Sequence, residues 1–439
     1  MTYNGDLQAL ISNGRVDRRL YTDPEIFDIE IRRIFGQAWI YVGHHSQLRR
    51  AGDFTTTRIG RDRIIVARHD NGALHALYNR CAHRGAEVCA RPNGNARSFI
   101  CPYHAWTYRT DGSLESIPLA KGYGADLEKR RSELGLERVA RLKSYRGFLF
   151  ASQSAEGAGL AEFLGPEVCA AFDNFVDRAP GGGITLMGGK TVQQFRANWK
   201  LQIENSIDLL HPNILHHNAV DSVNRLPESI SRASNIEIAI TRSNGLSLDQ
   251  WDEMQTAALP GGHCWMGGFI SDVAKREPTT EAESWQRDYR AALVKRHGDD
   301  KAAEILDFSR HNTIVYPNLF VNPQLSQIRI LHPVAVDRTE QHGYLFKLDG
   351  APDELFHAGI RALNLVNSPA SIITTDDHEV FERIQAALAF GDRDWIDWTR
   401  GFDGRRVDDE AILSRGTNEI LMRNQHDAWL TYMSPVESK

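Results

Sequence analysis

Residues 81–104 read CAHRGAEVCARPNGNARSFICPYH, and this stretch contains two short pairs of metal-ligating side chains. One residue separates Cys81 from His83, and two residues separate Cys101 from His104. Each pair brings one thiolate and one imidazole to a tight turn. Such a set can hold a [2Fe–2S] cluster, with two sulfur ligands on one iron and two ring nitrogens on the other. The sequence therefore predicts a redox centre that transfers one electron at a time.

A structural zinc ion is the main alternative, because two cysteines and two histidines also satisfy tetrahedral Zn²⁺. Common zinc sites keep like ligands together, however, whereas each pair here mixes cysteine with histidine. A disulfide framework is disfavoured because the total of five cysteines is odd and the other three, Cys89, Cys169 and Cys264, are scattered.

Length and charge exclude several classes of partner. A chain of 439 residues is long enough for two or three domains. The 51 Lys and Arg residues against 57 Asp and Glu give a net charge of −6 without basic runs, so we expect neither nucleic acid nor an anionic membrane as a partner. No segment has the apolar length of a membrane span or a signal peptide, and cysteines are few, so we expect a soluble cytoplasmic protein.

The chain divides into three parts that differ in their pattern of apolar and turn-forming residues. Residues 1–39 have helical spacing and are expected to pack on the larger domain as a lead-in. Residues 40–155 contain short strands, among them two that flank a hairpin turn at Asn71-Gly72, and predict a small antiparallel β domain. Residues 165–439 mix long helices with strands at 318–321 and 328–331, which indicates an α+β domain.

A second candidate metal site lies at residues 198–217, NWKLQIENSIDLLHPNILHH. On a helix, Asp208 and His211 would share a face, and His216 would follow two turns after Asp208. Burial of these ionisable groups without partners would cost several kcal/mol, so a metal or a dense hydrogen-bond network is expected. Pro212 is predicted to kink or restart the helix.

Two imidazoles and one carboxylate would leave open coordination positions on Fe(II). The best carboxylate is in residues 374–388, TTDDHEVFERIQAAL. Asp377 precedes Phe381 by four residues and Ile384 by seven, so it is predicted to lie on the buried face of a helix, whereas Asp376 falls outside that face. The alternative is that neither aspartate binds a metal: acidic residues favour the first turn of a helix, and Thr375 could be the N-cap.

Together, Cys-x-His, Cys-x-x-His and Glu-Asn-x-x-Asp-x-x-His-x4-His resemble the large (alpha) subunit of Rieske non-heme iron aromatic-ring-hydroxylating oxygenases, over nearly the whole chain. The resemblance implies a Rieske domain at 40–155 and a catalytic domain of helix-grip type, an antiparallel sheet with helices, at 165–439. It implies that the [2Fe–2S] cluster is held by Cys81, His83, Cys101 and His104. It also implies that a mononuclear Fe(II) is held by His211, His216 and Asp377.

Two further residues match positions with roles in that family. Asp208 matches the aspartate thought to link a cluster histidine of one subunit to an iron-ligand histidine of its neighbour, and Asn205 matches a residue near the iron. The segment 418–433 is similar to the C-terminal helix of alpha subunits that pair with a small beta subunit.

The chain departs from the family pattern at two positions, and two ligand choices stay open. Leu210 stands where tyrosine is usual, and Ala105 where glycine is usual. Because some relatives have five residues between the iron histidines, His217 is an alternative to His216, which we favour. Asp376 is likewise an alternative to Asp377.

The resemblance implies an oxidoreductase that uses O₂ and electrons from NAD(P)H, delivered by a separate reductase with or without a ferredoxin. It would hydroxylate an aromatic ring, as a cis-dihydroxylating dioxygenase or, alternatively, as a monooxygenase or demethylase. An alpha3 or alpha3beta3 oligomer is implied. The second metal site disfavours another class, a Rieske electron carrier. A third class, a zinc-stabilised scaffold, would be established by a colourless protein that contains zinc and no sulfide.

The segment His-Pro-Asn-Ile-Leu-His resembles the form in family members that act on aromatic carboxylates more than the form in naphthalene or biphenyl enzymes. A carboxylate substrate would need a buried arginine, and Arg329 is one candidate through charge-assisted hydrogen bonds. We favour the plainer interpretation that Arg329 is a surface-facing strand residue.

Overall fold

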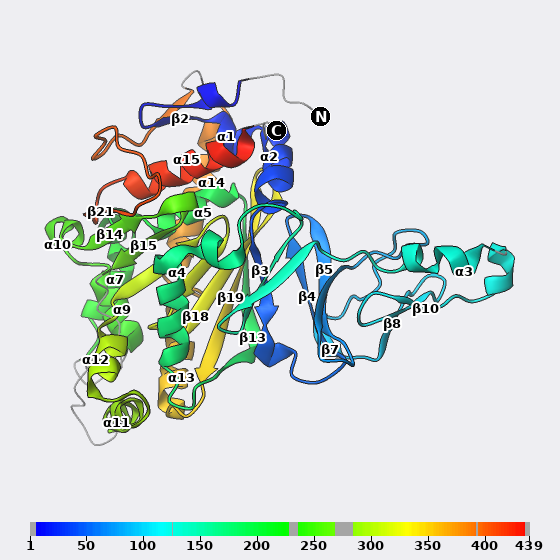
Figure 1. Ribbon diagram of the computed structural model, residues 1–439. Coiled ribbons are helices and arrows are strands. Elements are labelled where there is room, and N and C mark those ends of the chain that lie inside the picture. Colours follow the sequence, from blue (N-terminus) through cyan, green and yellow to red (C-terminus); the bar gives the residue numbers. More distant parts are fainter. Residues whose placement is uncertain (1–5, 125, 228–235, 268–283, 392–393, 435–439) are drawn as a thin grey trace. The chain divides into compact units, whose positions relative to one another are not determined.

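The computed structural model describes residues 6–124, 126–227, 236–267, 284–391 and 394–434. It contains two compact units (Figure 1). The smaller unit is Ile31–Phe163, and the larger unit combines Met1–Glu30 with Leu164–Lys439. None of the helices in the described ranges has both the length and the apolar character that crossing a membrane requires.

The smaller unit is built from three antiparallel sheets. The four-stranded sheet has the order β6-β5-β4-β7, and the other two have the orders β10-β9-β8 and β11-β12-β3. Their strands are β3 (Ile40–His44), β4 (Asp53–Ile59), β5 (Asp62–Arg68), β6 (Leu74–Tyr78), β7 (Asn93–Asn95), β8 (Ser98–Ile100), β9 (Thr107–Arg109), β10 (Leu114–Ser116), β11 (Arg141–Tyr145) and β12 (Phe148–Ser152). A short helix, α3 (Leu127–Arg130), follows β10.

The predicted hairpin at Asn71-Gly72 is confirmed. It joins β5 to β6, with Ile65 opposite Leu77 in the register. Gly72 has φ 84°, which a residue without a Cβ adopts at little cost. The core that this hairpin helps to form also buries Cys81 and Cys101, so the predicted cluster loops are tied to a packed sheet.

The larger unit contains an eight-stranded antiparallel sheet with the order β13-β19-β18-β17-β16-β15-β14-β21. Its strands are β13 (Ile184–Phe195), β14 (Gln255–Ala258), β15 (Cys264–Gly267), β16 (Arg310–Val315), β17 (Leu319–Asn322), β18 (Gln327–Ala335), β19 (Arg338–Leu348) and β21 (Ile412–Arg415). The strands predicted at 318–321 and 328–331 correspond to β17 and β18. The α+β class is therefore confirmed.

Helices surround this sheet. They are α4 (Leu160–Asp177), α5 (Trp199–Ser206), α6 (His211–Leu215), α7 (His217–Asn224), α9 (Ile236–Ser243), α10 (Leu248–Asp252), α11 (Trp285–His297), α12 (Asp299–Asp307), α13 (Asp353–Val366), α14 (Thr374–Leu388) and α15 (Ile420–Met433). Figure 1 shows α14 and α15 near one end of the sheet and α11 and α12 near the other.

The predicted helical lead-in is only partly helical. Helices α1 (Arg19–Thr22) and α2 (Pro24–Glu30) and a π-helical turn at Ile31–Phe35 are present. Before them, however, β1 (Ile11–Ser12) and β2 (Arg15–Asp17) form a hairpin, and β2 pairs with β20 (Trp395–Asp397). Long-range strand pairing has overridden the local helical spacing here.

A buried carboxylate holds the helix that precedes the predicted iron site. Glu30, at the end of α2, accepts hydrogen bonds from Trp199 Nε1 at 2.9 Å, Lys200 Nζ at 2.6 Å and Trp429 Nε1 at 2.6 Å. Glu30 is fully buried and Lys200 is 5% exposed. A buried ion pair is tolerated when further hydrogen bonds satisfy its charges, and the two tryptophan N–H groups supply such bonds to Glu30. The pairing of Glu30 with Trp199 and Lys200 holds the start of α5 in place.

Candidate metal centres and cavity

The four predicted cluster ligands lie on two loops, one between β6 and β7 and one between β8 and β9. In each loop a backbone hydrogen bond closes the turn: Gly85 N–H donates to the Cys81 carbonyl at 2.9 Å, and Ala105 N–H donates to the Cys101 carbonyl at 3.0 Å. Gly85 and Ala105 both have positive φ, 72° and 57°. The two loops therefore have the same turn, and it explains why glycine is expected at position 105.

The side chains in these loops suit a mixed-ligand [2Fe–2S] cluster. Both thiols are buried, and the His83 and His104 rings lie 4.6 Å apart. The His83 Nδ1 atom is buried without a hydrogen-bond partner in the described part of the chain, as an atom reserved for a metal would be. The Tyr108 hydroxyl lies 3.1 Å from Cys81 Sγ, at a position where it can donate a hydrogen bond to a cluster thiolate.

The second site begins at a break between two helices, and the break starts earlier in the chain than the sequence predicted. Helix α5 ends at Ser206 and α6 begins at His211 with Pro212 in its first turn, where the missing N–H costs nothing. The predicted restart at Pro212 is confirmed, but the placement of Asp208 on a helix is wrong. Asp208 lies in the break, where its carboxylate accepts hydrogen bonds from the N–H groups of Leu210 and His211, both at 3.1 Å.

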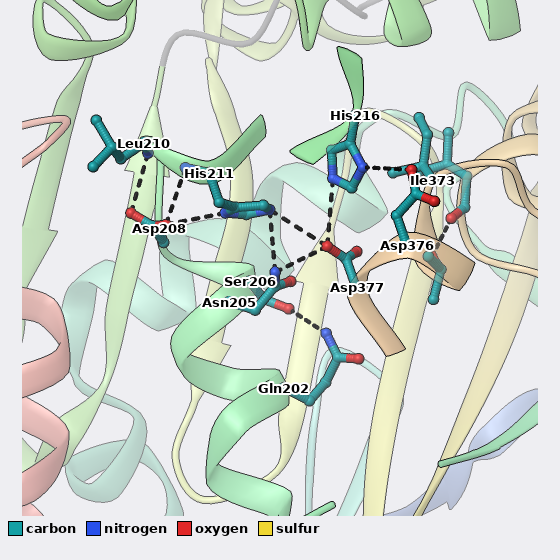
Figure 2. A network of polar contacts seen from close by, with 12 residues as sticks. Gln202, Asn205, Ser206, Asp208, Leu210, His211, His216, Ile373, Asp376 and Asp377 are labelled. Atoms are coloured by element: carbon teal, nitrogen blue, oxygen red, sulfur yellow. Dashed lines mark hydrogen bonds and ion pairs between the residues drawn. The ribbon is translucent and has the colours of Figure 1, made fainter. Parts of the chain in front are cut away.

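Three of the predicted ligands converge beyond this break (Figure 2). Asp377 Oδ1 lies 3.6 Å from His211 Nε2 and 3.4 Å from His216 Nε2. One ligand atom of each of these three side chains lies within 4.8 Å of the other two. Among the described residues, this is the one group of three or more His, Cys, Asp or Glu side chains that lie so close together. Two imidazoles and one carboxylate can hold Fe(II) on one side and leave the other side open.

The protonation state of His216 and the groups around His211 and Asp377 fit a metal. Burial lowers the pKa of His216 to about 4, so its imidazole is neutral at pH 7, as a ligand must be. Asp208 Oδ2 lies 3.1 Å from His211 Nδ1 and fixes the orientation of that ring. The Asn205 amide lies 3.1 Å from His211 Nε2 and donates to Asp377 Oδ1 at 3.0 Å, which places Asn205 beside the site.

Burial alone would raise the pKa of Asp208. Its hydrogen bonds with the His211 ring and with the backbone N–H groups of Leu210 and His211 outweigh that effect and lower the pKa. Arg400 also lies 3.6 Å from Asp208 Oδ1. Asp208 therefore stays ionised between the predicted iron ligand and Arg400.

Exposure and distances distinguish His216 from His217 and Asp377 from Asp376. The His216 side chain is 1% exposed, whereas that of His217 is 68% exposed and lies 3.6 Å from Asp221. Asp377 points into the site, whereas Asp376 is more exposed and lies 3.6 Å from the outer nitrogen of His216, Nδ1. The geometry therefore brings His216 and Asp377 together and leaves the alternatives outside.

Helix α14 differs in detail from its prediction. It begins at Thr374 after Ile373, whose side chain makes no cap, so Thr375 is not the N-cap. Asp377 and Phe381 are buried as expected, but Ile384 is exposed and Gln385 is buried instead. Gln385 is buried because it hydrogen-bonds the backbone of Tyr21 and Asn198, a pairing that helical spacing cannot reveal.

A cavity of ≈ 100 Å³ adjoins the predicted iron ligands. Several amide side chains line it, and the sequence did not single them out: Asn244, Asn312, Asn322, Gln327 and Asn367. They come from separate strands and helices, so only the folded sheet brings them together. His311 also lines the cavity, and burial followed by the charge of Arg329 lowers its pKa to about 3.

The expectation that Arg329 faces the surface is wrong. Arg329 is 9% exposed and lines the cavity from β18. Its guanidinium donates to Asn312 Oδ1 at 3.0 Å and Asn367 Oδ1 at 3.3 Å, and it lies over the Phe320 ring at 4.7 Å. Nearly every residue of β18 is buried, so alternation along the strand does not separate a solvent face from a core face.

Comparisons with known proteins agree with this arrangement. Residues 38–145 match the Rieske [2Fe-2S] domain family, and residues 185–435 match the family described as ring hydroxylating alpha subunit (catalytic domain). The anthranilate 1,2-dioxygenase large subunit of Acinetobacter baylyi is 31% identical over 94% of this chain and 88% of its own length. The toluate 1,2-dioxygenase subunit alpha of Pseudomonas putida is 32% identical over 95% of this chain and 91% of its own length.

A solved structure supports the fold. Naphthalene 1,2-dioxygenase with indole bound in its active site has a TM-score of 0.80, with 99% of this chain and 95% of that chain covered at 23% identity. At that identity the likeness concerns the fold alone.

Proposed function

The chain belongs to the ring-hydroxylating oxygenase alpha subunits, and from this premise we propose that it cis-dihydroxylates the ring of an aromatic carboxylate. The reaction would join both atoms of O₂ to two ring carbons, with two electrons from NAD(P)H and two protons. The names of the anthranilate and toluate relatives, both dioxygenases of aromatic acids, support this substrate class.

The observation that carries the proposal is the convergence of His211, His216 and Asp377 beside a cavity. Fe(II) held by these residues would supply the activation of O₂, with electrons from the [2Fe–2S] cluster. Around it, Asn205 would orient Asp377, and Asp208 would orient His211. The cluster would be held by Cys81, His83, Cys101 and His104.

The protein is the alpha subunit of a multi-subunit dioxygenase, and we propose an alpha3 or alpha3beta3 assembly. Electrons would arrive from a separate reductase, with or without a ferredoxin. Asp208 would then lie between His211 and a cluster histidine, His104, of a neighbouring subunit. The pairing of one Asp208 oxygen with the His211 ring, while the other faces Arg400, supports this role.

Electron paramagnetic resonance (EPR) of the anaerobic, reduced protein tests the two metal sites. We expect a rhombic [2Fe–2S] signal and, after addition of nitric oxide, an Fe–NO signal. His216→Ala should remove only the Fe–NO signal, and His217→Ala should keep both, since His217 is the matched neighbour outside the site. A cluster signal without any Fe–NO species in iron-supplied wild-type protein would instead indicate an electron carrier.

Labelled oxygen tests the reaction. With reductase, NADH, benzoate and ¹⁸O₂, we expect a product that contains two labelled atoms as a cis-diol. A single labelled atom would indicate a monooxygenase, and the proposal of dihydroxylation would be wrong.

A further inference from the structure

We infer that Arg329 binds the carboxylate of the substrate inside the cavity and restricts the enzyme to aromatic monocarboxylates, excluding both hydrocarbons and dicarboxylates. This inference rests on the proposed function, and it adds the residue that selects the substrate and the charge that the substrate carries.

Arg329 is a buried cation that has no anionic partner in the described part of the chain. Its two hydrogen bonds go to the neutral amide oxygens of Asn312 and Asn367. No carboxylate in the described ranges lies within 4.0 Å of its guanidinium. A guanidinium has five N–H donors, so part of its donor capacity is free for a ligand. Buried charges in proteins are normally paired, and an anionic ligand would supply the missing partner.

The guanidinium keeps its charge. Burial lowers the pKa of Arg329 to about 10, and the charge of Asp377 partly opposes that effect. Arg329 is therefore protonated at neutral pH. Asp377 cannot serve as its dedicated counterion, because Asp377 lies with its carboxylate between His211 and His216.

A second unsatisfied donor lies on the same strand. Gln327 precedes Arg329 by two residues on β18, so both side chains are on one face of the sheet. Gln327 lines the cavity, and its Nε2 group is buried without a hydrogen-bond partner in the described part of the chain. A carboxylate that pairs with Arg329 would therefore have a second donor on the same face of the sheet.

The remainder of the cavity wall fits one carboxylate and an apolar ring. Arg329 is the single Lys or Arg among the described residues that line the cavity, and His311 is neutral because its pKa is lowered to about 3. A second carboxylate would therefore be buried without a cation to pair with. Apolar side chains provide the surface for a ring: Leu209, Ile240, Trp251, Met266 and Val366.

The test measures binding of benzoate, benzamide, toluene and phthalate to the complete, reductase-free oxygenase through changes in its Fe–NO spectrum. In wild-type protein we expect benzoate to bind at least tenfold more tightly than benzamide or toluene, and phthalate not to bind. Arg329→Met should weaken benzoate binding about 10- to 100-fold, the loss of a hydrogen bond to a charged group, without weakening benzamide binding. Turnover should show the same change in KM rather than in kcat.

A second variant, Asn312→Asp, tests the inference independently in case Arg329→Met does not fold. Asn312→Asp keeps the size of the side chain and places a carboxylate where Asn312 Oδ1 now lies, 3.0 Å from the guanidinium. The new internal ion pair should weaken benzoate binding while the Fe–NO signal stays intact. Arg310→Met is the matched control, because Arg310 lies on β16 of the same sheet, pairs with Glu167 and does not line the cavity. It should leave benzoate binding unchanged.

The outcomes separate this inference from the proposed function. Unchanged benzoate binding in both Arg329→Met and Asn312→Asp, or tighter wild-type binding of toluene than of benzoate, would overturn the role of Arg329 even if the enzyme dihydroxylates a ring. Conversely, Arg329-dependent binding of benzoate without oxygenation would support the inference and contradict the proposed reaction.

Discussion

The two metal sites occupy contrasting surroundings. The cluster loops lie at the surface of a small β unit, where Tyr103 packs against His104 and is 60% exposed. The iron site is more deeply buried, with His216 1% and Asp377 6% exposed and the His211 side chain 22% exposed. A centre that exchanges electrons with other proteins must be near the surface, whereas chemistry on activated oxygen requires that bulk water be excluded. The difference teaches that one chain can meet both demands by placing its ligands on loops in one unit and on helices and their ends in the other.

The largest expected effect tests whether the two sites are independent. Asp377→Asn should abolish iron binding, because it removes the carboxylate that lies between the two histidines, while the visible spectrum of the cluster stays unchanged. The adjacent Asp376→Asn is the control and should retain iron. Cys101→Ser should have the opposite effect, with loss of the cluster and retention of iron. Iron and sulfide analysis checks all three variants, and loss of both centres in any of them would show that the sites depend on each other.

The support of His211 by Asp208 gives the next effect. Asp208→Asn should lower iron affinity about 10- to 100-fold, because an amide orients the imidazole less well than a carboxylate and does not raise its basicity. Competition with a chelator measures the affinity. An unchanged affinity would mean that Asp208 serves only in electron transfer.

The cluster has its own supporting hydrogen bond, from Tyr108. Tyr108→Phe removes the hydroxyl that lies 3.1 Å from Cys81 Sγ. A hydrogen bond to sulfur stabilises the more negative, reduced cluster, so its loss should lower the midpoint potential by about 40 mV, the equivalent of ~1 kcal/mol for one electron. Redox titration monitored by EPR checks this value, and a potential that rises or stays constant would contradict it.

The smallest effect compares the two cluster loops with each other. Ala105→Gly should stabilise the second loop by about 1 kcal/mol or less, because a residue with a Cβ is strained at φ 57°. Gly85→Ala is the reverse change at the same place in the first loop, where an added Cβ would meet no atom closer than 3.9 Å. It should destabilise its loop by a similar amount. The temperature at which the cluster absorbance is lost should rise for the first variant and fall for the second.

The sequence predicted the cluster loops more completely than the iron site, and the reason is locality. The geometry around Cys81 and Cys101 is made within short turns, so the spacing of ligands and the glycine position carry the information. The iron site depends on the end of α5 and on contacts with α14, which follows much later in the chain. Spacing identified Asp377, but it could not show that Asp208 lies outside a helix, because its partners are backbone N–H groups freed by the break.

The cavity wall was the least predictable part. Arg329 and Gln327 lie on a strand that is buried along most of its length, so no alternation marks the face that lines the cavity. The strand register and the end of α13 place the amide oxygens of Asn312 and Asn367 beside Arg329, and neither can be read from the sequence around these residues. Polar residues that are scattered in sequence and gathered by a sheet leave no local pattern.

The buried carboxylate of Glu30 has a consequence for the order in which the protein is made. On the ribosome, Glu30 is synthesised early, Trp199 and Lys200 follow midway, and Trp429 comes close to the end. The charge of Glu30 therefore cannot be fully satisfied until α15 has left the exit tunnel. We expect nascent chains that stop before Trp429 to hold α5 loosely and to bind iron poorly, even though every proposed iron ligand is already present in them.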